Sequence, residues 1–306
     1  MTRRDRADLR RVLLAWYAQN RRDLPWRATR DPYAVLVAEV MLQQTQVERV
    51  APKYREFLGR FPDFSSLAES PTADVIRAWS ALGYNLRAVR LRRLARHVVN
   101  ELDGRLPEDV ERLRRLQGVG EYTASAVACF AFGADVPVVD TNVRRVLSRV
   151  FWGGQAPPPR DLSRLAGELV PSGLGYDWNQ ALMELGATVC LARRPRCGVC
   201  PVRAYCRAAP VVADGPARVA EAQASYQVER FEGSRRYYRG RIVELLRALT
   251  DSEMLALSKL GAEVKSGFGN GDLPWLRELV GGLERDGLVK VVNVGGPGPE
   301  TLVSLP

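Results

Sequence analysis

The sequence predicts a mainly α fold in two parts, a large helical domain followed by a small α+β module. Apolar residues recur at helical spacing up to about residue 206, and few stretches alternate with period two. Four cysteines cluster at the end of that region, after which the composition shifts to Ala, Pro, Gly and polar residues. At 306 residues the chain is long enough to bury a substantial core.

The first predicted helix is amphipathic, because its apolar residues Leu9, Val12, Leu13 and Tyr17 fall at helical spacing. Further helices with short connectors are predicted over residues 32–48, 51–60, 73–82, 86–101, 108–116, 121–132, 140–150, 161–170 and 178–190. Residues 1–206 are therefore expected to form one domain, and residues 207–235 a linker that runs over the surface.

Residues 236–306 are expected to form a winged-helix-like module. Helices predicted over 239–250, 251–261 and 273–287 precede two apolar runs, KVVNV and TLVSL, which are joined by a glycine-rich turn. Two roles stay open for this module: it reads duplex DNA through the helix at 273–287, or it packs against the first domain or a partner protein.

Charge and composition narrow the class of protein. The chain has 45 Lys+Arg and 35 Asp+Glu, a net charge of +10, which favours a polyanionic partner, although the codon bias of a GC-rich genome also raises arginine. No apolar run approaches the roughly 20 residues that a transmembrane helix needs.

No secretory signal is present, so we expect a cytoplasmic protein. The single histidine, His97, argues against His-rich zinc sites and Ser-His-Asp hydrolysis.

The cysteine cluster indicates a metal centre. Cys190, Cys197, Cys200 and Cys206 form a C-x6-C-x2-C-x5-C run, which can hold either a structural zinc ion or a [4Fe-4S] cluster. A zinc ribbon usually pairs two CxxC knuckles, and this run has one, so iron–sulfur is favoured. The segment 191–207 also carries five arginines and no acid, which suits contact with a phosphate backbone.

Gly118, Val119 and Gly120 lie between two predicted helices. Two glycines permit a tight turn, and the N-terminus of the next helix offers N–H groups to an anion. The arrangement is that of a helix-hairpin-helix, which grips a DNA phosphate without reading sequence, or of an ordinary helix–helix turn.

Two acids interrupt apolar surroundings and are candidates for chemistry. Glu39 lies in VLVAEVMLQQTQV, where it is either buried or rotated to solvent. Asp140 follows VPVV at a predicted helix start, where it can cap the helix and also take part in a reaction.

Seven ordered motifs together resemble the MutY family of adenine DNA glycosylases, within the helix-hairpin-helix iron–sulfur superfamily. They are LPWR at 24–27, AEVMLQQTQV at 38–47, LGYN at 82–85, GVGEYT at 118–123, VVDTNVRRVLSR at 138–149, NQALMELGATVC at 179–190 and the four-cysteine loop. Longer members carry a Nudix-like C-terminal region, for which 239–306 is too short and wrongly patterned. The chain is most similar to short members of the family.

The resemblance implies base excision from a flipped nucleotide in base excision repair. Glu39 would protonate the adenine ring, and we expect burial to raise its pKa and keep it protonated. Asp140 would stay ionised beside the sugar, whose transition state resembles an oxocarbenium ion. Tyr122 occupies the position of the Schiff-base lysine in strand-nicking relatives. Because no lysine lies between residues 54 and 258, we predict a monofunctional glycosylase.

The resemblance also implies the contacts to DNA. Arg22, Trp26, Arg27, Leu42 and Gln180 would line the adenine pocket. Gln44 and Tyr84 would enter the base stack, and core packing is the alternative for Trp26 and Tyr84. The implied partner is double-stranded DNA with a mismatch or an oxidised guanine, bound by a monomer at the nucleoid.

Two positions depart from the family pattern. Asp140-Thr141-Asn142-Val143 stands where Asp-Gly-Asn-Val is common, and Asn85 replaces a frequent second tyrosine. The first alternative is a thymine or uracil mismatch DNA glycosylase of the same superfamily. The second is a non-enzymatic iron–sulfur protein that only binds DNA.

Overall fold

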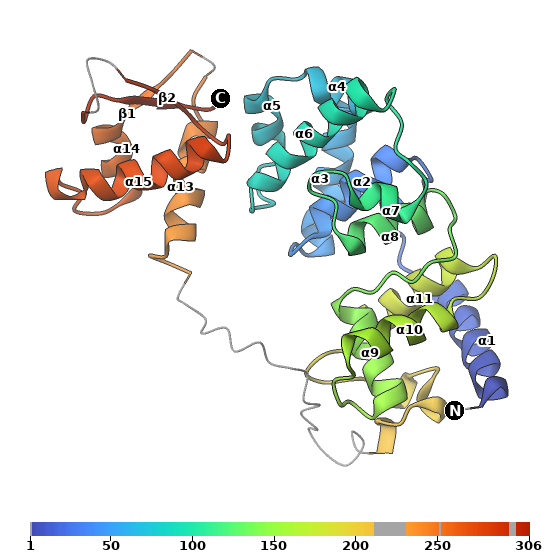
Figure 1. Ribbon diagram of the computed structural model, residues 1–306. Helices are drawn as coiled ribbons and strands as arrows, with labels where there is room; N and C mark the ends of the chain where they lie inside the picture. Colours follow the sequence, from blue (N-terminus) through green and yellow to red (C-terminus); the bar gives the residue numbers. More distant parts are fainter. Residues whose placement is uncertain (1, 211–230, 251, 294–297) are drawn as a thin grey trace. The chain divides into compact units, whose positions relative to one another are not determined.

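The structure, a computed structural model, describes residues 2–210, 231–250, 252–293 and 298–306 and is largely helical (Figure 1). The chain divides into two compact units, one of Met1–Val35 with Pro107–Ser225 and the other of Leu36–Leu106 with Tyr226–Pro306. The boundaries 1–206, 207–235 and 236–306 stay a prediction. Most of the predicted linker, residues 211–230, lies outside the described residues.

The first unit is built from α-helices and three short 3-10 turns. These elements are α1 (Arg3–Asn20), η1 (Pro25–Arg27), the start of α2 (Pro32–Leu42), α7 (Val110–Arg114), α8 (Glu121–Phe130), α9 (Thr141–Trp152), α10 (Pro159–Leu169), α11 (Gly175–Thr188), η2 (Cys197–Val199) and η3 (Arg203–Tyr205). Leu13 of α1, Leu147 of α9 and Trp178 of α11 are buried in one core cluster. This core supports the N-terminal end of α9 and the cysteine loop.

The second unit joins a helical part to the C-terminal module. Its elements are the rest of α2, α3 (Val47–Arg60), α4 (Phe64–Glu69), α5 (Thr72–Ala78), α6 (Leu86–Glu101), α13 (Arg235–Arg247), β1 (Leu255–Ala256), α14 (Leu257–Val264), η4 (Asn270–Asp272), α15 (Leu273–Arg285), β2 (Lys290–Val292) and β3 (Leu302–Ser304).

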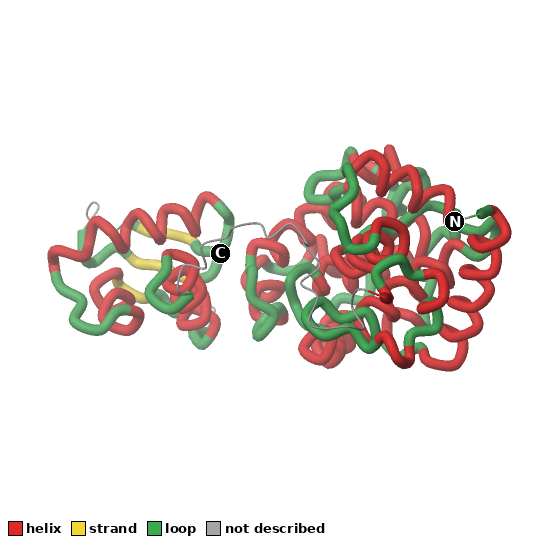
Figure 2. The backbone as a smooth tube through the Cα atoms, turned by 90° about the horizontal axis from the view of Figure 1, so that it is seen from below, coloured by secondary structure: helices red, strands yellow, loops and turns green. Residues whose placement is uncertain are grey.

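The C-terminal module has the winged-helix order of elements, which confirms that prediction. Its three strands form an antiparallel sheet in the order β1-β3-β2, and Val303 of β3 pairs with both Leu255 and Val291. Figure 2 shows these strands side by side within the module. The two-residue strand β1 was not expected, because it is too short to produce an alternating pattern.

The module packs against α5 and α6. Ile76 of α5 and Val89 of α6 belong to the same buried cluster as the core of the module. Arg247 Nε donates to the carbonyl oxygen of Ile76 at 3.0 Å, and Ala73 N–H donates to the carbonyl oxygen of Pro306 at 3.2 Å. Of the two roles left open for the module, packing against the rest of the chain is therefore realised.

Three helix predictions need correction. The helix expected over 32–48 ends at Leu42, and α3 begins at Val47, because Gln44 adopts a left-handed φ of 54° between them. A helix over Phe64–Glu69 was missed, although Asp63 and Ser66 form a capping box at its start. The helix expected over 251–261 begins only at Leu257.

Within the described part of the chain, no helix is long and apolar enough to cross a membrane.

Candidate functional site

Asp140 caps the N-terminus of α9, as its position in the sequence predicts. Its Oδ1 accepts from the N–H of Val143 at 2.6 Å, and its Oδ2 accepts from Asn142 Nδ2 at 2.8 Å. A helix N-terminus interacts favourably with negative charge. The side chain is half-buried. Asp140 is therefore held in one orientation and is still accessible to a ligand.

Arg145 joins this carboxylate to the cysteine loop. Its Nη2 donates to Asn142 Oδ1 at 2.8 Å, and its Nε donates to the carbonyl oxygen of Cys190 at 2.8 Å. Because Asn142 in turn donates to Asp140, a continuous set of hydrogen bonds runs from the loop to the carboxylate. No pattern in the sequence singles out Arg145, since arginines are frequent throughout the chain.

Asn179 positions the segment that leads to Asp140. This side chain is 1% exposed, accepts from Val138 N–H at 2.8 Å and donates to the carbonyl oxygens of Val136 and Gly175 at 2.9 and 2.8 Å. A loop that runs through the interior needs such partners for its main-chain groups. The segment 136–138 is thus anchored to α11.

Gly186 lets α9 and α11 approach each other closely beside Asp140. A Cβ at Gly186 would lie 2.6 Å from the Cβ of Asn142, a distance that real Cβ contacts do not show. The main chain of α11 also accepts a hydrogen bond here, from Arg145 Nη2 to Gly186 O at 2.7 Å. Glycine is therefore required at this position because a larger side chain would not fit, and not because the backbone has a positive φ.

Four of the five predicted base-pocket residues lie in the first unit, and two of them, Arg22 and Arg27, converge on Glu184. Arg22 Nε lies 2.6 Å from Glu184 Oε1, and Arg27 Nη2 lies 2.7 Å from Glu184 Oε2. Arg27 Nε also donates to Gln180 Oε1 at 2.9 Å. This orients the carboxamide of Gln180, which is 5% exposed. Trp26 lies next to Arg27 in η1 and is 8% exposed.

Glu184 was missed in the sequence, although a signal was present. It lies one helical turn after Gln180 in the apolar run NQALMELGA, the same kind of interruption that singled out Glu39. Its side chain is fully buried, and its charge is balanced by two arginines.

Glu39 and Leu42 lie in the second unit, on the C-terminal half of α2. Of the two orientations considered for Glu39, the buried one is realised, because its exposed fraction is 5%. Leu36 and Val40 beside it are buried as well. Leu42 is half-buried at the last position of the helix. Their predicted roles stay predictions.

Gln44 and Tyr84 lie on two loops that a single buried arginine holds together. Arg87 Nη1 donates to the carbonyl oxygens of Val40 at 2.8 Å and Met41 at 3.0 Å, and its Nη2 donates to that of Leu82 at 3.1 Å. Burial lowers the pKa of Arg87 to about 10. The guanidinium thus satisfies carbonyl groups that the break after α2 leaves without helical partners.

Both loop residues have strained backbones and exposed side chains. Tyr84 has a φ of 44° and is 43% exposed. Gln44, with a φ of 54°, is exposed too. Such left-handed conformations in non-glycine residues are uncommon and concentrate at functional sites. The core-packing alternative for Tyr84 does not hold.

The predicted hairpin connects α7 to α8. Gly118 has a φ of 88°, and Val119 is buried with its N–H donating to Leu116 O at 3.1 Å. Gly120 is the N-cap of α8 and has no side chain to cap it. First-turn N–H groups of α8 can therefore serve an anion. Tyr122 lies in this first turn and is half-buried.

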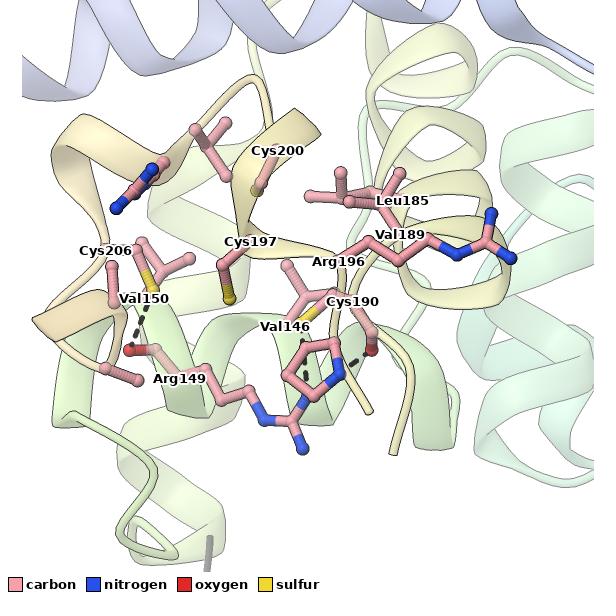
Figure 3. A pocket seen from close by; sticks show the side chains of 15 residues that line it. Val146, Arg149, Val150, Leu185, Val189, Cys190, Arg196, Cys197, Cys200 and Cys206 are labelled. Carbon is pink, nitrogen blue, oxygen red and sulfur yellow. Dashed lines mark hydrogen bonds between the residues drawn. The ribbon is translucent and has the colours of Figure 1, made fainter. Parts of the chain in front are cut away.

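The four cysteines line one pocket at the end of α11. Figure 3 shows their sulfur atoms around this pocket, with apolar side chains such as Val146 and Leu185 beside them. The guanidinium of Arg149 lies 3.4 Å from Cys190 Sγ and donates to Leu191 O at 2.7 Å.

The residues around the pocket fit an iron–sulfur cluster. Burial, with a smaller contribution from the neighbouring cysteines, raises the pKa of Cys200 to about 11, so a cationic centre is needed to hold this group as a thiolate. In the described part of the chain no three such ligands are close enough for one metal ion. Four cysteines that line one pocket without a histidine are the donor set that holds a [4Fe-4S] cluster.

Comparisons with known proteins decide the family. A model of the HhH-GPD superfamily of base excision DNA repair proteins matches residues 37–172, and a model of the iron–sulfur binding domain of endonuclease III matches residues 190–206. An adenine DNA glycosylase of Mycolicibacterium smegmatis is 46% identical over 243 residues, which cover 78% of this chain and 80% of that protein. The chain belongs to the MutY family of adenine DNA glycosylases.

Other relatives and solved structures agree with the membership in the MutY family. Human adenine DNA glycosylase is 47% identical over 209 residues, 64% of this chain and 38% of the human protein. The structure of a thermostable thymine-DNA glycosylase is 34% identical with a TM-score of 0.65 and covers 68% of this chain and 98% of that one. Endonuclease III bound to DNA, at 21% identity and a TM-score of 0.60, shares the fold.

This MutY-family chain is thus a DNA glycosylase of base excision repair that binds DNA and carries a [4Fe-4S] cluster, as the resemblance implied. When bound, the cluster supplies iron–thiolate bonds that hold residues 190–206 in shape. The iron–sulfur match decides against the zinc alternative. Family membership also sets aside the non-enzymatic alternative.

Proposed function

We propose that this chain is a monofunctional glycosylase that removes adenine paired with 8-oxoguanine or guanine. The observation that carries the proposal is the fixed carboxylate of Asp140 at the N-terminus of α9. An ionised group held there can stabilise the positive charge that develops on the sugar as the N-glycosidic bond breaks. The relatives named adenine DNA glycosylase, among them the Mycolicibacterium protein, support adenine as the base.

Glu39 is the proposed acid. Proton transfer to a ring nitrogen of adenine makes the base a better leaving group, and a buried carboxyl group is well suited to hold that proton. Its burial on the C-terminal half of α2 supports this role. Water then adds to the anomeric carbon of the sugar cation and loses a proton, which completes hydrolysis of the N-glycosidic bond.

Gln180 is the proposed reader of the flipped base, together with Arg22, Trp26, Arg27 and Leu42. Arg27 Nε donates to Gln180 Oε1, and this hydrogen bond fixes the direction of the amide. No described residue accepts from Gln180 Nε2, so this group can donate to an acceptor on the base. The ion pairs of Glu184 keep both arginines in place.

The reaction stops at base release in this proposal. Tyr122 stands where an imine-forming lysine is expected in strand-nicking relatives, and no lysine lies between residues 54 and 258. Treatment with borohydride during the reaction should therefore trap no covalent adduct with DNA. A trapped adduct would reject the monofunctional assignment.

The DNA partner is double-stranded and carries a mismatch or an oxidised guanine, and the enzyme acts as a monomer in the cytoplasm at the nucleoid. Gln44, Tyr84 and the hairpin at Gly118–Gly120 are the proposed contacts. The exposed, strained backbone of the first two and the uncapped start of α8 support these assignments.

Thymine or uracil removal is the second candidate. A thymine/uracil-DNA glycosylase of Methanothermobacter thermautotrophicus is 36% identical over 199 residues, 64% of this chain and 90% of that protein. Release of free base from duplexes with A:8-oxoguanine, A:G, T:G and U:G pairs separates the two. We expect release from the first two duplexes and its loss in Glu39→Gln. Release from T:G or U:G alone would replace adenine as the substrate, and an active Glu39→Gln would reject Glu39 as the acid.

A further inference from the structure

A groove in the second unit lies between the loops of Gln44 and Tyr84 and the C-terminal module. It encloses about 720 Å³, and its lining includes both loops, the N-terminal half of α13 and the end of α15. The winged-helix module thus provides one wall of a cavity whose other wall carries the two proposed intercalating residues.

Arg236 of α13 makes direct contact with Tyr84. Its Nη1 donates to the hydroxyl oxygen of Tyr84 at 3.2 Å, and its guanidinium carbon lies 5.7 Å from the centre of the tyrosine ring. The same guanidinium lies 5.0 Å from the ring of Phe231, which is 56% exposed. A cation placed between two exposed aromatic rings is typical of nucleic-acid contacts.

The groove is strongly cationic. Arg49, Arg90 and Arg236 line it, are exposed, and form no ion pair with any acid in the described part of the chain. Arg239 also lines it and pairs with Asp286. With the buried Arg87, five arginines and one aspartate line the groove, which leaves a clear excess of positive charge.

The arginines of α13 lie where helix stability alone does not favour them. Its sequence begins RRYYRGR, with four arginines among the first seven residues and no acid in the first turn. The N-terminus of a helix carries partial positive charge, so cations there are unfavourable without a counter-charge. Arg235 pairs with Glu278 and Arg239 pairs with Asp286, whereas Arg236 has no such partner in the described part of the chain.

The helix that a winged-helix domain usually offers to DNA is α15, and it lacks such an excess here. Arg277 and Arg285 are balanced by Glu278 and Glu284. Its inner face is buried with Leu276 and Leu283, and its C-terminal end lies against α6, where Arg93 Nη2 donates to Asp286 O at 3.4 Å. The charge therefore favours α13 over α15 as the DNA-facing element.

We propose that this groove binds the phosphate backbone of duplex DNA beside the point where Gln44 and Tyr84 enter the stack, with Arg236 contacting a phosphate while it holds the hydroxyl of Tyr84. The inference rests on the proposed function, because that function places the two residues in the duplex. The C-terminal module then acts in substrate binding through α13, and α15 serves to fix it to the rest of the second unit.

The test measures binding of the full-length protein with its cluster to a duplex that carries 2′-fluoro-adenosine opposite 8-oxoguanine, as a function of salt. The fluorine withdraws electrons and slows formation of the sugar cation, so binding is seen without cleavage. We expect Arg236→Gln to weaken binding about tenfold and to lower the slope of log K against log salt by about 1. Arg236→Lys keeps the charge and should keep the slope.

The matched control is Arg285→Gln on α15, which should retain the affinity and slope of the wild type. Wild-type affinity and slope in Arg236→Gln, or a larger loss in Arg285→Gln, would overturn the inference. A weaker affinity with an unchanged slope would also overturn it, because a lost phosphate contact must change the slope. Base release by the wild-type protein is assayed separately, so failure of the proposed function is distinguished from failure of the groove.

Discussion

Arg87 Nη1 lies 2.5 Å from the carbonyl oxygen of Gln43, in the break that follows α2. The same guanidinium donates through Nη2 to Thr45 Oγ1 at 3.0 Å and to Gly83 O at 3.2 Å. One side chain therefore holds both loops that carry the proposed intercalating residues.

Loss of this guanidinium should destabilise the protein and misplace both loops. We expect Arg87→Met to lower the free energy of unfolding by about 3 kcal/mol, because several buried carbonyl groups lose their donor. Base release should fall as well. Arg96→Met on the exposed face of the same helix should change stability by less than about 0.5 kcal/mol. Equal unfolding midpoints in urea for Arg87→Met and the wild type would contradict this role.

The end of α2 shows why part of the fold could not be predicted from local sequence. Residues 43–48 (QQTQVE) contain no glycine or proline that would end a helix, so the local sequence does not show the break. Distant Arg87 takes the carbonyl groups, and the helix ends at Leu42. Asp140 could be predicted as a helix cap because its signal is local. Glu184 also has a local signal, because it interrupts an apolar run, but its ion pairs could not be predicted, because Arg22 and Arg27 are far away in the chain.

The buried carboxylate of Glu184 should contribute strongly to stability. Glu184→Gln leaves Arg22 and Arg27 without their buried counter-charge, and we expect a loss of about 3–5 kcal/mol. Glu168→Gln is the matched control, since the Arg6–Glu168 pair lies at the surface and should contribute less than about 1 kcal/mol. Similar thermal unfolding temperatures for the two variants would contradict a large contribution of the Glu184 ion pairs to stability.

Gly186 tests how closely α9 must approach α11. The added Cβ of Gly186→Ala would collide with Asn142, so we expect a loss of about 1–3 kcal/mol and slower base release through displacement of Asp140. Gly167→Ala in α10 meets nothing within 4 Å and should be neutral or stabilising by up to about 1 kcal/mol. Wild-type activity and stability in Gly186→Ala would show that α9 and α11 can move apart without cost.

The cluster can be removed through one ligand. Cys200→Ser should lose the visible iron–sulfur absorbance and the order of residues 190–206. Cys129→Ala is the control: this cysteine is buried away from the pocket, and burial raises its pKa to about 11, so the absorbance should persist. Loss of the absorbance in Cys129→Ala and its retention in Cys200→Ser would reverse the ligand assignment.

The most direct test of the account is single-turnover release of free adenine from an A:8-oxoguanine duplex by the wild type and Asp140→Asn. Asparagine caps a helix about as well as aspartate, so the variant should keep its fold and lose only the charge. We predict release by the wild type and a rate at least about 10²-fold lower in Asp140→Asn. Equal rates would contradict the assignment of Asp140 to the chemical step.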